Sequence, residues 1–361
     1  MSRAARAVID LSALRHNLQQ AHRAAPQQQL IAIIKADAYG HGSVPVARAL
    51  ADADVFGVAC LEEALSLREA GIDKPILLLE GFFHADELPL IQRHKLQIVV
   101  HGEHQLEVLA SLPAQAFSIP TWLKVDTGMH RLGILPHAVP AAWQRLAACP
   151  AVAPLLGLMT HLANADDRGD DTTRQQLESL AAVRPDPSIA VSIANSAGIL
   201  AWPASHGDAV RPGIMLYGVS PMLGESGAQR NLRPVMTLSS ELISTRQCKK
   251  GDAVGYGGSW VCPEDMPVGV VAIGYGDGYP RHAPSGTPVL VNGRRAALIG
   301  RVSMDMICVD LRDQPAAAVG GPVILWGAGL PAEEIAGCAS SIAYALFCGV
   351  TSRVKKETID G

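Results

Sequence analysis

The stretch Leu30–Gly42 reads L-I-A-I-I-K-A-D-A-Y-G-H-G, an apolar run that ends on a lysine and opens into a glycine-bracketed loop. A run of Leu, Ile and Ala is typical of a strand that is covered on both faces, as in a parallel sheet. Enzymes built on parallel sheets carry their reactive groups where the strands end. The segment therefore predicts a buried strand with Lys35 and Tyr39 at its reactive end.

Lys35 is the chemically distinctive residue of this segment. At the rim of an apolar sheet, the loss of hydration favours the neutral amine over the ammonium ion. A neutral amine can form an imine with a carbonyl compound, and pyridoxal phosphate is the usual one in proteins. A lysine that only marks the end of a strand and extends to water explains the segment equally well.

Composition narrows the class of protein. The chain has 361 residues, enough for two domains, with 48 % hydrophobic and 18 % charged residues, as in a packed globular enzyme. The net charge of −4, without a basic run, gives no electrostatic reason to expect nucleic acid or a membrane surface as a partner. No segment is apolar enough for a signal peptide or a membrane span. The seven cysteines are an odd number and include no C-x-x-C pair, so neither disulfides nor structural zinc are expected. Free cysteines of this kind favour a location in the reducing cytoplasm.

The first two thirds of the chain alternate between strand-like and helix-like stretches. The helix candidates, with apolar residues three and four apart, are a segment from Ser12, Leu61–Ala70, Glu103–Leu112, Val139–Ala148 and Thr172–Val183. After an opening strand at Ala7–Leu11, the strand candidates are Leu30–Lys35, Val55–Cys60, Pro75–Glu80, Leu96–His101, Pro120–Asp126, Pro154–Leu162, Ala190–Asn195 and Ala209–Gly218. Strands separated by crossovers in this way predict an α/β fold, a closed (β/α)₈ barrel of TIM type. An open doubly wound sheet is the alternative, although no G-x-G-x-x-G turn follows the first strand.

The pattern changes near Asn231, which predicts a barrel over residues 1–231 and a mainly β domain over residues 232–361. Asn292-Gly293 between two apolar runs is a strong hairpin signal. The predicted elements are strands at Val235–Thr245, Val268–Ile273, Pro288–Val291, Ala296–Leu311 and Val350–Val354, and a helix at Ala332–Phe347.

The strand tips of the predicted barrel carry an amine, several cations, a hydroxyl and a glycine turn. In order they supply Lys35 and Tyr39, Lys124 and Asp126 with Met129-His130-Arg131, His161, Asn195-Ser196, and Arg211-Pro212-Gly213-Ile214. His161 with Asp166 and Asp167 suggests a metal hydrolase, but a third ligand from another strand tip is missing, so no metal site is predicted.

Motifs in the same order over nearly the whole chain resemble those of the pyridoxal-phosphate-dependent alanine racemases. They are K-A-D-A-Y-G-H-G at Lys35–Gly42, K-V-D-T-G-M-H-R-L-G at Lys124–Gly133, A-N-S-A-G at Ala194–Gly198, R-P-G-I-M-L-Y-G at Arg211–Gly218, G-Y-G-D-G-Y-P-R at Gly274–Arg281 and G-R-V-S-M-D at Gly300–Asp305. The resemblance implies a homodimer with shared active sites, each chain having an N-terminal barrel and a C-terminal β domain. It also implies an enzyme that interconverts L- and D-alanine, for peptidoglycan synthesis or for alanine catabolism.

The resemblance assigns the catalytic roles. Lys35 is expected to hold the cofactor as an imine and to act as one of two bases on opposite faces of Cα. Tyr256, lent by the partner's β domain, matches the second base. Free Tyr and Lys titrate near about 10, so both need help near neutrality. His161 is implied to link Tyr256 to Arg211, which faces the pyridine nitrogen and keeps it unprotonated, since a guanidinium only donates.

The remaining assignments also follow the resemblance. The substrate side is expected to involve Arg131 on the carboxylate, with Tyr275 and Met304 of the second subunit at the entrance and Arg281 and Arg301 matching more weakly. The residues expected to bind the cofactor phosphate are Tyr39, Ser196, Gly213, Ile214 and Tyr344. Lys124 matches a position that some members carry as a carbamylated lysine.

Three rival functions stay open at this point. A decarboxylase of the same fold would pair the pyridine nitrogen with a carboxylate, whereas Arg211 stands here. A broad-spectrum racemase would typically be exported. A cofactor-carrier protein would be a lone barrel, without the β domain that contains Tyr256.

Overall fold

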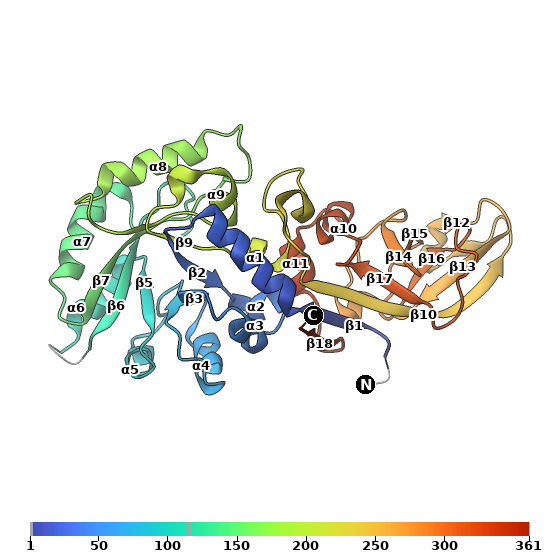
Figure 1. Cartoon of the computed structure of the whole chain (residues 1–361), viewed down its shortest axis with the longest axis horizontal. Coiled ribbons are helices and arrows are strands. Elements are labelled where there is room, and N and C mark those ends of the chain that lie inside the picture. Colours follow the sequence, from blue (N-terminus) through green and yellow to red (C-terminus); the bar gives the residue numbers. More distant parts are fainter. Residues whose placement is uncertain (1–2, 114–116, 361) are drawn as a thin grey trace.

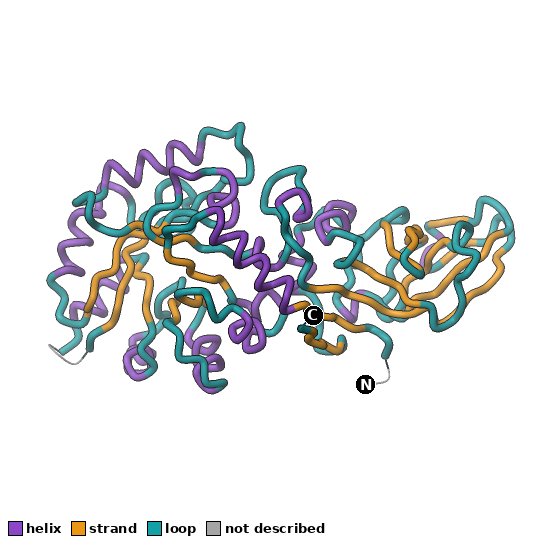
Figure 2. The backbone as a smooth tube through the Cα atoms, viewed as in Figure 1, coloured by secondary structure: helices purple, strands orange, loops and turns teal. Residues whose placement is uncertain are grey.

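The computed structural model describes residues 3–113 and 117–360. Figure 1 shows an elongated chain, with a barrel wrapped by helices at one end and a strand-rich unit at the other. Figure 2 shows that helices dominate the first unit and strands the second.

The first unit is a closed parallel barrel. This confirms the predicted fold, and the alternative prediction of an open doubly wound sheet is wrong. Its strands, in spatial and chain order, are β2 (Gln29–Ile33), β3 (Val55–Val58), β4 (Ile76–Leu78), β5 (Gln97–Val100), β6 (Ile119–Lys124), β7 (Val152–Met159), β8 (Val191–Ser192) and β9 (Ala209–Val210). Closure comes from the parallel pairing of Leu30 in β2 with Val210 in β9. The apolar runs of these strands are buried, as the sequence pattern requires.

Helices cover the outside of the barrel and connect its strands. Asp10 caps the first helix, because its carboxylate accepts hydrogen bonds from the backbone N–H groups of Ser12 and Ala13. The helices of this unit are α1 (Leu11–Ala24), α2 (Lys35–Gly40), α3 (Ser43–Ala49), α4 (Leu61–Glu69), α5 (Leu88–Arg93), α6 (Glu103–Ser111), α7 (Val139–Ala147), α8 (Thr172–Val183) and α9 (Ser196–Ala201). Short 3₁₀ turns lie at η1 (Ala85–Glu87), η2 (Pro136–Ala138), η3 (Pro203–Ser205), η4 (Ile214–Tyr217) and η5 (Gly227–Arg230).

The second unit is built mainly from antiparallel strands. They are β1 (Arg6–Asp10), β10 (Met236–Cys248), β11 (Ala253–Val254), β12 (Trp260–Val261), β13 (Met266–Val271), β14 (Pro288–Val291), β15 (Arg294–Ile299), β16 (Ile307–Asp310), β17 (Pro322–Trp326) and β18 (Lys355–Ile359). The long β10 pairs with β17 along its first half and with β13 along its second half, which closes the sheet on itself. The unit also contains η6 (Tyr256–Gly258), η7 (Tyr275–Asp277), α10 (Ala332–Cys338) and α11 (Ala343–Cys348).

The hairpin predicted at Asn292-Gly293 is present. Val291 pairs with Arg294 across a two-residue turn, and both turn residues have positive φ, 50° at Asn292 and 79° at Gly293. This conformation is what a tight hairpin requires and what Asn-Gly tolerates.

The first and last strands of the chain differ from the predicted ones. The opening strand β1 does not join the barrel but pairs with β10 and β18. Val350–Val354 is not a strand; the last strand is β18, and β17 was not predicted at all. Residues 6–10 therefore belong structurally with the second sheet, which local sequence pattern cannot reveal.

Three predicted elements are interrupted by backbone geometry. The strand predicted at Ala209–Gly218 ends at Val210, because Pro212 lacks an N–H and the chain turns into η4. Ala296–Leu311 is split into β15 and β16 by Gly300, whose φ is +73°. The helix predicted at Ala332–Phe347 is broken into α10 and α11, with Ser340 in the left-handed region at φ 48°.

No helix within the described ranges, 3–113 and 117–360, has both the length and the apolar character needed to cross a membrane.

Gly218 is predicted to be the glycine at which an added methyl group does most damage. Its φ is +88°, and a Cβ would lie 2.0 Å from the carbonyl oxygen of Arg233, on the connection into the second unit. Gly286→Ala is the matched control, because Gly286 has φ +96° but no atom within 4 Å of its Cβ position. We expect Gly286→Ala to cost about 1–2 kcal/mol and Gly218→Ala to cost more than about 3 kcal/mol in the free energy of unfolding by urea. Equal losses would contradict this interpretation.

Candidate active site

A cavity of about 540 Å³ lies at the carboxyl ends of the barrel strands. Among the residues selected from the sequence, its lining includes Lys35, Tyr39, Lys124, Arg131, His161, Ser196, Arg211, Gly213, Ile214 and Tyr344. Of the described residues, Tyr256, Tyr275 and Met304 are not part of this lining. The fold thus gathers the first set in one place and leaves the second set elsewhere.

Lys35 and Tyr39 reach the cavity through a left-handed turn. Ala36, Asp37, Ala38 and Tyr39 all have φ of 51–53° and ψ of 44–53°, the left-handed helical region. Residues other than glycine rarely adopt this conformation, and never in a run unless the surroundings impose it. The turn follows β2 directly, so that both ends of the lysine–tyrosine segment line the same space.

Side chains from other elements hold this turn in place. Glu63 of α4 accepts hydrogen bonds from the N–H groups of Ala36, at 2.7 Å, and Ala59, at 2.8 Å, which joins the tips of β2 and β3. Asp37 accepts from the N–H of Ser43 at 2.7 Å and from the Nζ of Lys356 at 2.8 Å. The unusual backbone is therefore fixed from both sides.

An anion-sized cradle lies between α9 and η4. The Oγ of Ser196, at the start of α9, accepts a 2.9 Å hydrogen bond from the N–H of Gly213. The Tyr39 hydroxyl lies close to Gly213, since a Cβ added there would be 3.0 Å from it, a tighter contact than usual. Burial raises the pKa of Tyr39, which keeps the hydroxyl protonated as a donor. Hydroxyl and backbone N–H donors so arranged suit a phosphate group.

Arg211 is fully buried beneath this cradle. Its guanidinium donates to the Ser192 Oγ at 2.6 Å and to the carbonyl oxygens of Thr160, at 2.5 Å, and Ile193, at 3.0 Å. Burial lowers its pKa to about 10, which still leaves it charged at neutral pH. Its position is therefore rigid, and it can donate hydrogen bonds but not accept them.

His161 lies against Arg211 and is held in its neutral form. Burial, followed by the positive charges of Arg211 and Lys124, lowers its pKa well below the ordinary value. The Nδ1 atom lies 3.4 Å from an Arg211 Nη atom, which can only donate. Nδ1 is therefore the acceptor, and the proton of the neutral ring belongs on Nε2.

The cavity concentrates positive charge. Burial, and then the charges of Arg211, Arg131 and Lys35, lower the pKa of Lys124 to about 8. Glu80, at the tip of β4, is the carboxylate that opposes these cations. Such a site favours small anionic ligands, such as phosphate esters and carboxylates.

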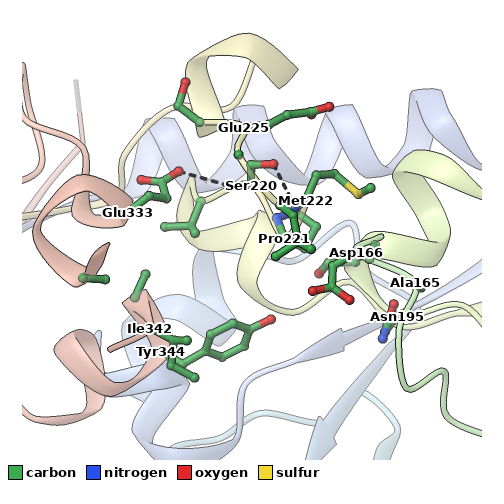
Figure 3. Close-up of a pocket in the computed structure, with 18 of the residues that line it drawn as sticks. Ala165, Asp166, Asn195, Ser220, Pro221, Met222, Glu225, Glu333, Ile342 and Tyr344 are labelled. Carbon is green, nitrogen blue, oxygen red and sulfur yellow. Dashed lines mark hydrogen bonds between the residues drawn. The ribbon is translucent and has the colours of Figure 1, made fainter. Parts of the chain in front are cut away.

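A second cavity, of about 780 Å³, adjoins the first and shares His161, Asn195, Ser196 and Tyr344 with it. In Figure 3, Tyr344 from α11 points across this space toward Asp166 and Asn195. Burial, and then the Asp166 carboxylate, raise the pKa of Tyr344 to about 12, so its hydroxyl stays protonated. The two cavities therefore meet at these shared residues.

Tyr256 lies on the short β11–β12 hairpin, whose strand β12 is at the end of the molecule away from the barrel in Figure 1. Its side chain is 69 % exposed. The hairpin rests on a small apolar cluster separate from the main core, formed by Val254, Cys262, Met266, Val268 and Ile299. Tyr256 is thus firmly supported but unpartnered within the described part of its own chain.

Other exposed apolar residues adjoin this hairpin. A Cβ on Gly257 would touch the Arg301 guanidinium, and one on Gly274 would meet the backbone of Met304. Met304 is 52 % exposed and Tyr275 is 39 % exposed. We call Tyr256, Tyr275 and Met304, with the neighbouring Val261 and Met306, the tyrosine surface. Each of these five residues exposes a large apolar side chain to solvent.

A buried ionic cluster holds the loops of the tyrosine surface. Asp277, which has no exposed surface, pairs with Arg3 at 2.6 Å and with Arg353 at 3.3 Å. Arg353 also contacts Asp305 at 2.5 Å. Backbone bonds from Tyr275 and Gly276 to the loop of residues 303–304 complete the arrangement. Arg3 near the start of the chain and Arg353 near its end thus hold these loops in place.

Several lining residues had no place among the sites selected from the sequence. They are Ile33, Leu79, Glu80, Leu132, Met159 and Thr160. Most lie at or beside the end of a barrel strand, and this position is the signal that could have identified them. Among the described residues, no three His, Cys, Asp or Glu side chains are grouped so as to hold a metal ion.

The closed barrel, its cationic cavity and the appended β unit define a barrel enzyme with an accessory domain. The family profile "Alanine racemase, N-terminal domain" matches residues 9–221, and "Alanine racemase, C-terminal domain" matches residues 235–358. The chain belongs to the alanine racemase family.

Individual relatives agree over the full length. An alanine racemase of Halorhodospira halophila is 52 % identical, over 100 % of this chain and 99 % of its own. The structure of the biosynthetic alanine racemase from Pseudomonas aeruginosa superposes with a TM-score of 0.95 at 48 % identity, covering 99 % of both chains. An alanine racemase from Bartonella henselae, solved with covalently bound pyridoxal phosphate, gives a TM-score of 0.86 at 28 % identity and 99 % coverage of both chains.

The lowered pKa of Lys124 makes a prediction about stability. Folding suppresses protonation of Lys124, so this group opposes folding by about 3 kcal/mol below pH 8, and the penalty fades as the pH rises toward 10.5. Lys124→Met should therefore stabilise the cofactor-free protein at pH 7, with a smaller gain at pH 9.5, in urea unfolding. Lys250→Met, at an exposed lysine, is the control and should change little. A loss of stability in Lys124→Met would contradict the prediction.

Proposed function

We propose that this protein is a pyridoxal-phosphate-dependent alanine racemase that interconverts L- and D-alanine by two bases on opposite faces of Cα. The observation that carries the proposal is that Lys35, Arg211 and the Ser196–Gly213 cradle line one cavity. An amine, a fixed cation and an anion cradle are the three contacts that this cofactor needs: one for its aldehyde, one for its ring nitrogen and one for its phosphate.

The residues present fit this cofactor. Tyr39, Ser196 and Gly213 would hold the phosphate, because the Tyr39 hydroxyl lies beside Gly213 and the Ser196 hydroxyl is bonded to its N–H. Lys35 would hold the aldehyde carbon covalently, and Arg211 would face the ring nitrogen. When bound, pyridoxal phosphate withdraws electrons from the substrate's Cα and so makes its proton removable.

Arg211 limits that withdrawal. Because Arg211 stays protonated, is held by fixed acceptors and can only donate, it would leave the ring nitrogen of a bound cofactor without a proton. Weak electron withdrawal favours return of a proton to Cα over side reactions such as transamination. A decarboxylase would be served better by a carboxylate at this position.

Arg131 supplies the charge that binds the substrate carboxylate. Arg131 is exposed at the cavity, where a planar guanidinium can take up a carboxylate through two hydrogen bonds. Lys124 stands beside it with a pKa of about 8, low enough for a sizeable fraction of free amine near neutral pH. A free amine is what carbamylation by carbon dioxide requires, and we propose Lys124 as the site if that modification occurs.

The second base requires a second chain. Tyr256 is exposed on the β unit of its own chain, and the cavity lacks it among the described lining residues. In a homodimer with two-fold symmetry, the tyrosine surface of each chain would cover the cavity of the other, which gives two identical sites. The proton that we assign to Nε2 of His161 would then be available to donate a hydrogen bond to the phenolate of the incoming Tyr256 and stabilise it.

We propose D-alanine supply for peptidoglycan in the cytoplasm as the physiological role. The relative from Pseudomonas aeruginosa, which shares the whole fold, is a biosynthetic alanine racemase. The cysteines of this chain are free thiols, which persist in a reducing compartment.

The first test is loss of optical activity. Purified protein with pyridoxal phosphate should abolish the circular dichroism of L-alanine, and equally that of D-alanine. Lys35→Ala should remove both this activity and the visible absorbance of protein-bound cofactor that survives desalting, whereas Lys250→Ala should keep both. Unchanged dichroism of alanine with cofactor present would overturn the proposal.

The shared site makes a sharper prediction. Lys35→Ala and Tyr256→Phe should each be nearly inactive alone. Mixed after dissociation and reassembly, they should recover about a quarter of wild-type activity, because half the dimers are mixed and each mixed dimer has one intact site. Mixing Lys35→Ala with the double variant Lys35→Ala/Tyr256→Phe is the control and should give no recovery. Failure of the first mixture to recover would place both bases in one chain.

A further inference from the structure

His41 is the one residue of the K-A-D-A-Y-G-H-G motif that is buried and titratable yet does not line the cavity. It follows the left-handed turn directly. Its Nδ1 atom lies 3.0 Å from the carbonyl oxygen of Ala38 and 2.9 Å from that of Tyr39. Carbonyl oxygens only accept, so Nδ1 carries the proton and donates to both.

The ring of His41 is clamped between aromatic groups. Its centroid lies 4.5 Å from that of Tyr217 and 5.0 Å from that of Phe347, on α11. The Tyr217 hydroxyl donates to the carbonyl of Ile33, at the end of β2. His41 thus connects the left-handed turn to β2 on one side and to α11 on the other.

The same aromatic group surrounds Tyr39. The Tyr39 ring lies 4.8 Å from Tyr217 and 5.6 Å from Tyr344, centroid to centroid. Gly40, between Tyr39 and His41, fits so closely that a Cβ would lie 2.2 Å from the carbonyl oxygen of Phe347. The Tyr39 hydroxyl is therefore aimed at Gly213 by the turn, and the turn is held by His41.

We propose that His41 is a positioning residue for the phosphate site: its Nδ1–H fixes the carbonyls of the left-handed turn and thereby holds the Tyr39 hydroxyl beside Gly213 and Ser196. This inference rests on the proposed function, because it assumes that the cradle binds the phosphate of pyridoxal phosphate. His41 does not touch the ligand itself.

The test compares two substitutions that separate the donor from the ring. His41→Asn keeps an N–H at the position of Nδ1 and loses the ring, whereas His41→Phe keeps an aromatic ring and loses the donor. Dissociation constants are measured by absorbance titration of the cofactor-free full chain with pyridoxal phosphate and with pyridoxal, which lacks the phosphate. Thermal unfolding of each cofactor-free variant is recorded alongside.

We expect His41→Phe to weaken binding of pyridoxal phosphate about tenfold, the scale of one hydrogen bond, and His41→Asn to restore most of it. Pyridoxal affinity should hardly change in either variant. In a Tyr39→Phe background the effect of His41→Phe should vanish, because the hydroxyl that it positions is gone. Equal losses for both ligands, or full additivity with Tyr39→Phe, would show a merely structural role and overturn the inference.

A measurement on the unaltered protein keeps the inference testable if His41→Phe does not fold. With ¹⁵N-labelled histidine, nuclear magnetic resonance should show His41 as the Nδ1–H tautomer in the folded protein, and an Nε2–H tautomer would overturn it. If the wild-type chain does not bind pyridoxal phosphate, the proposed function fails. If it binds but the two His41 variants match it, only this inference fails.

Discussion

The left-handed turn at Ala36–Tyr39 is the constraint on which the cavity depends. Each non-glycine residue in that conformation costs roughly 1–2 kcal/mol, so the turn opposes folding by several kcal/mol. The hydrogen bonds of Glu63, Asp37 and His41 and the aromatic packing around Tyr39 offset this cost. In return, the turn brings the Lys35 amine and the Tyr39 phenol, which lie on one short segment after β2, into the same cavity. Strain of this kind concentrates at functional sites because packing elsewhere can sustain it.

The positive charge gathered in the cavity also opposes folding. Lys124, Arg131, Arg211 and Lys35 stand close together. Burial, and then the repulsion from these neighbouring positive charges, lowers the pKa of Lys124 and of His161. An anionic ligand would relieve that repulsion, so stability and binding are linked here. His161 is neutral for the same reason, because a second positive charge beside Arg211 would destabilise the folded protein.

Much of the barrel could be predicted because alternation of buried strands and amphipathic helices is a local signal, and strand tips then indicate which side chains meet. The left-handed turn could not, because Ala and Asp do not favour positive φ and the turn depends partly on side chains distant in the sequence, Glu63 and Lys356. The pairing of β1 with β10, and the ion pairs of Arg3 and Arg353 with Asp277, join residues far apart in the chain. The exposure of Tyr256 likewise follows from the arrangement of the two units and not from V-G-Y-G-G.

The placement of β1 has a mechanical consequence. Strand β1 lies in the sheet of the second unit, the chain passes from it into the barrel at Asp10, and it returns to that sheet after Leu232, so two separate crossings join the units. A single crossing would act as a hinge, whereas two resist both swinging and twisting. A protease cut between Gly218 and Leu232 would therefore leave both fragments attached, still tied through the hydrogen-bonded ladder of the first strand.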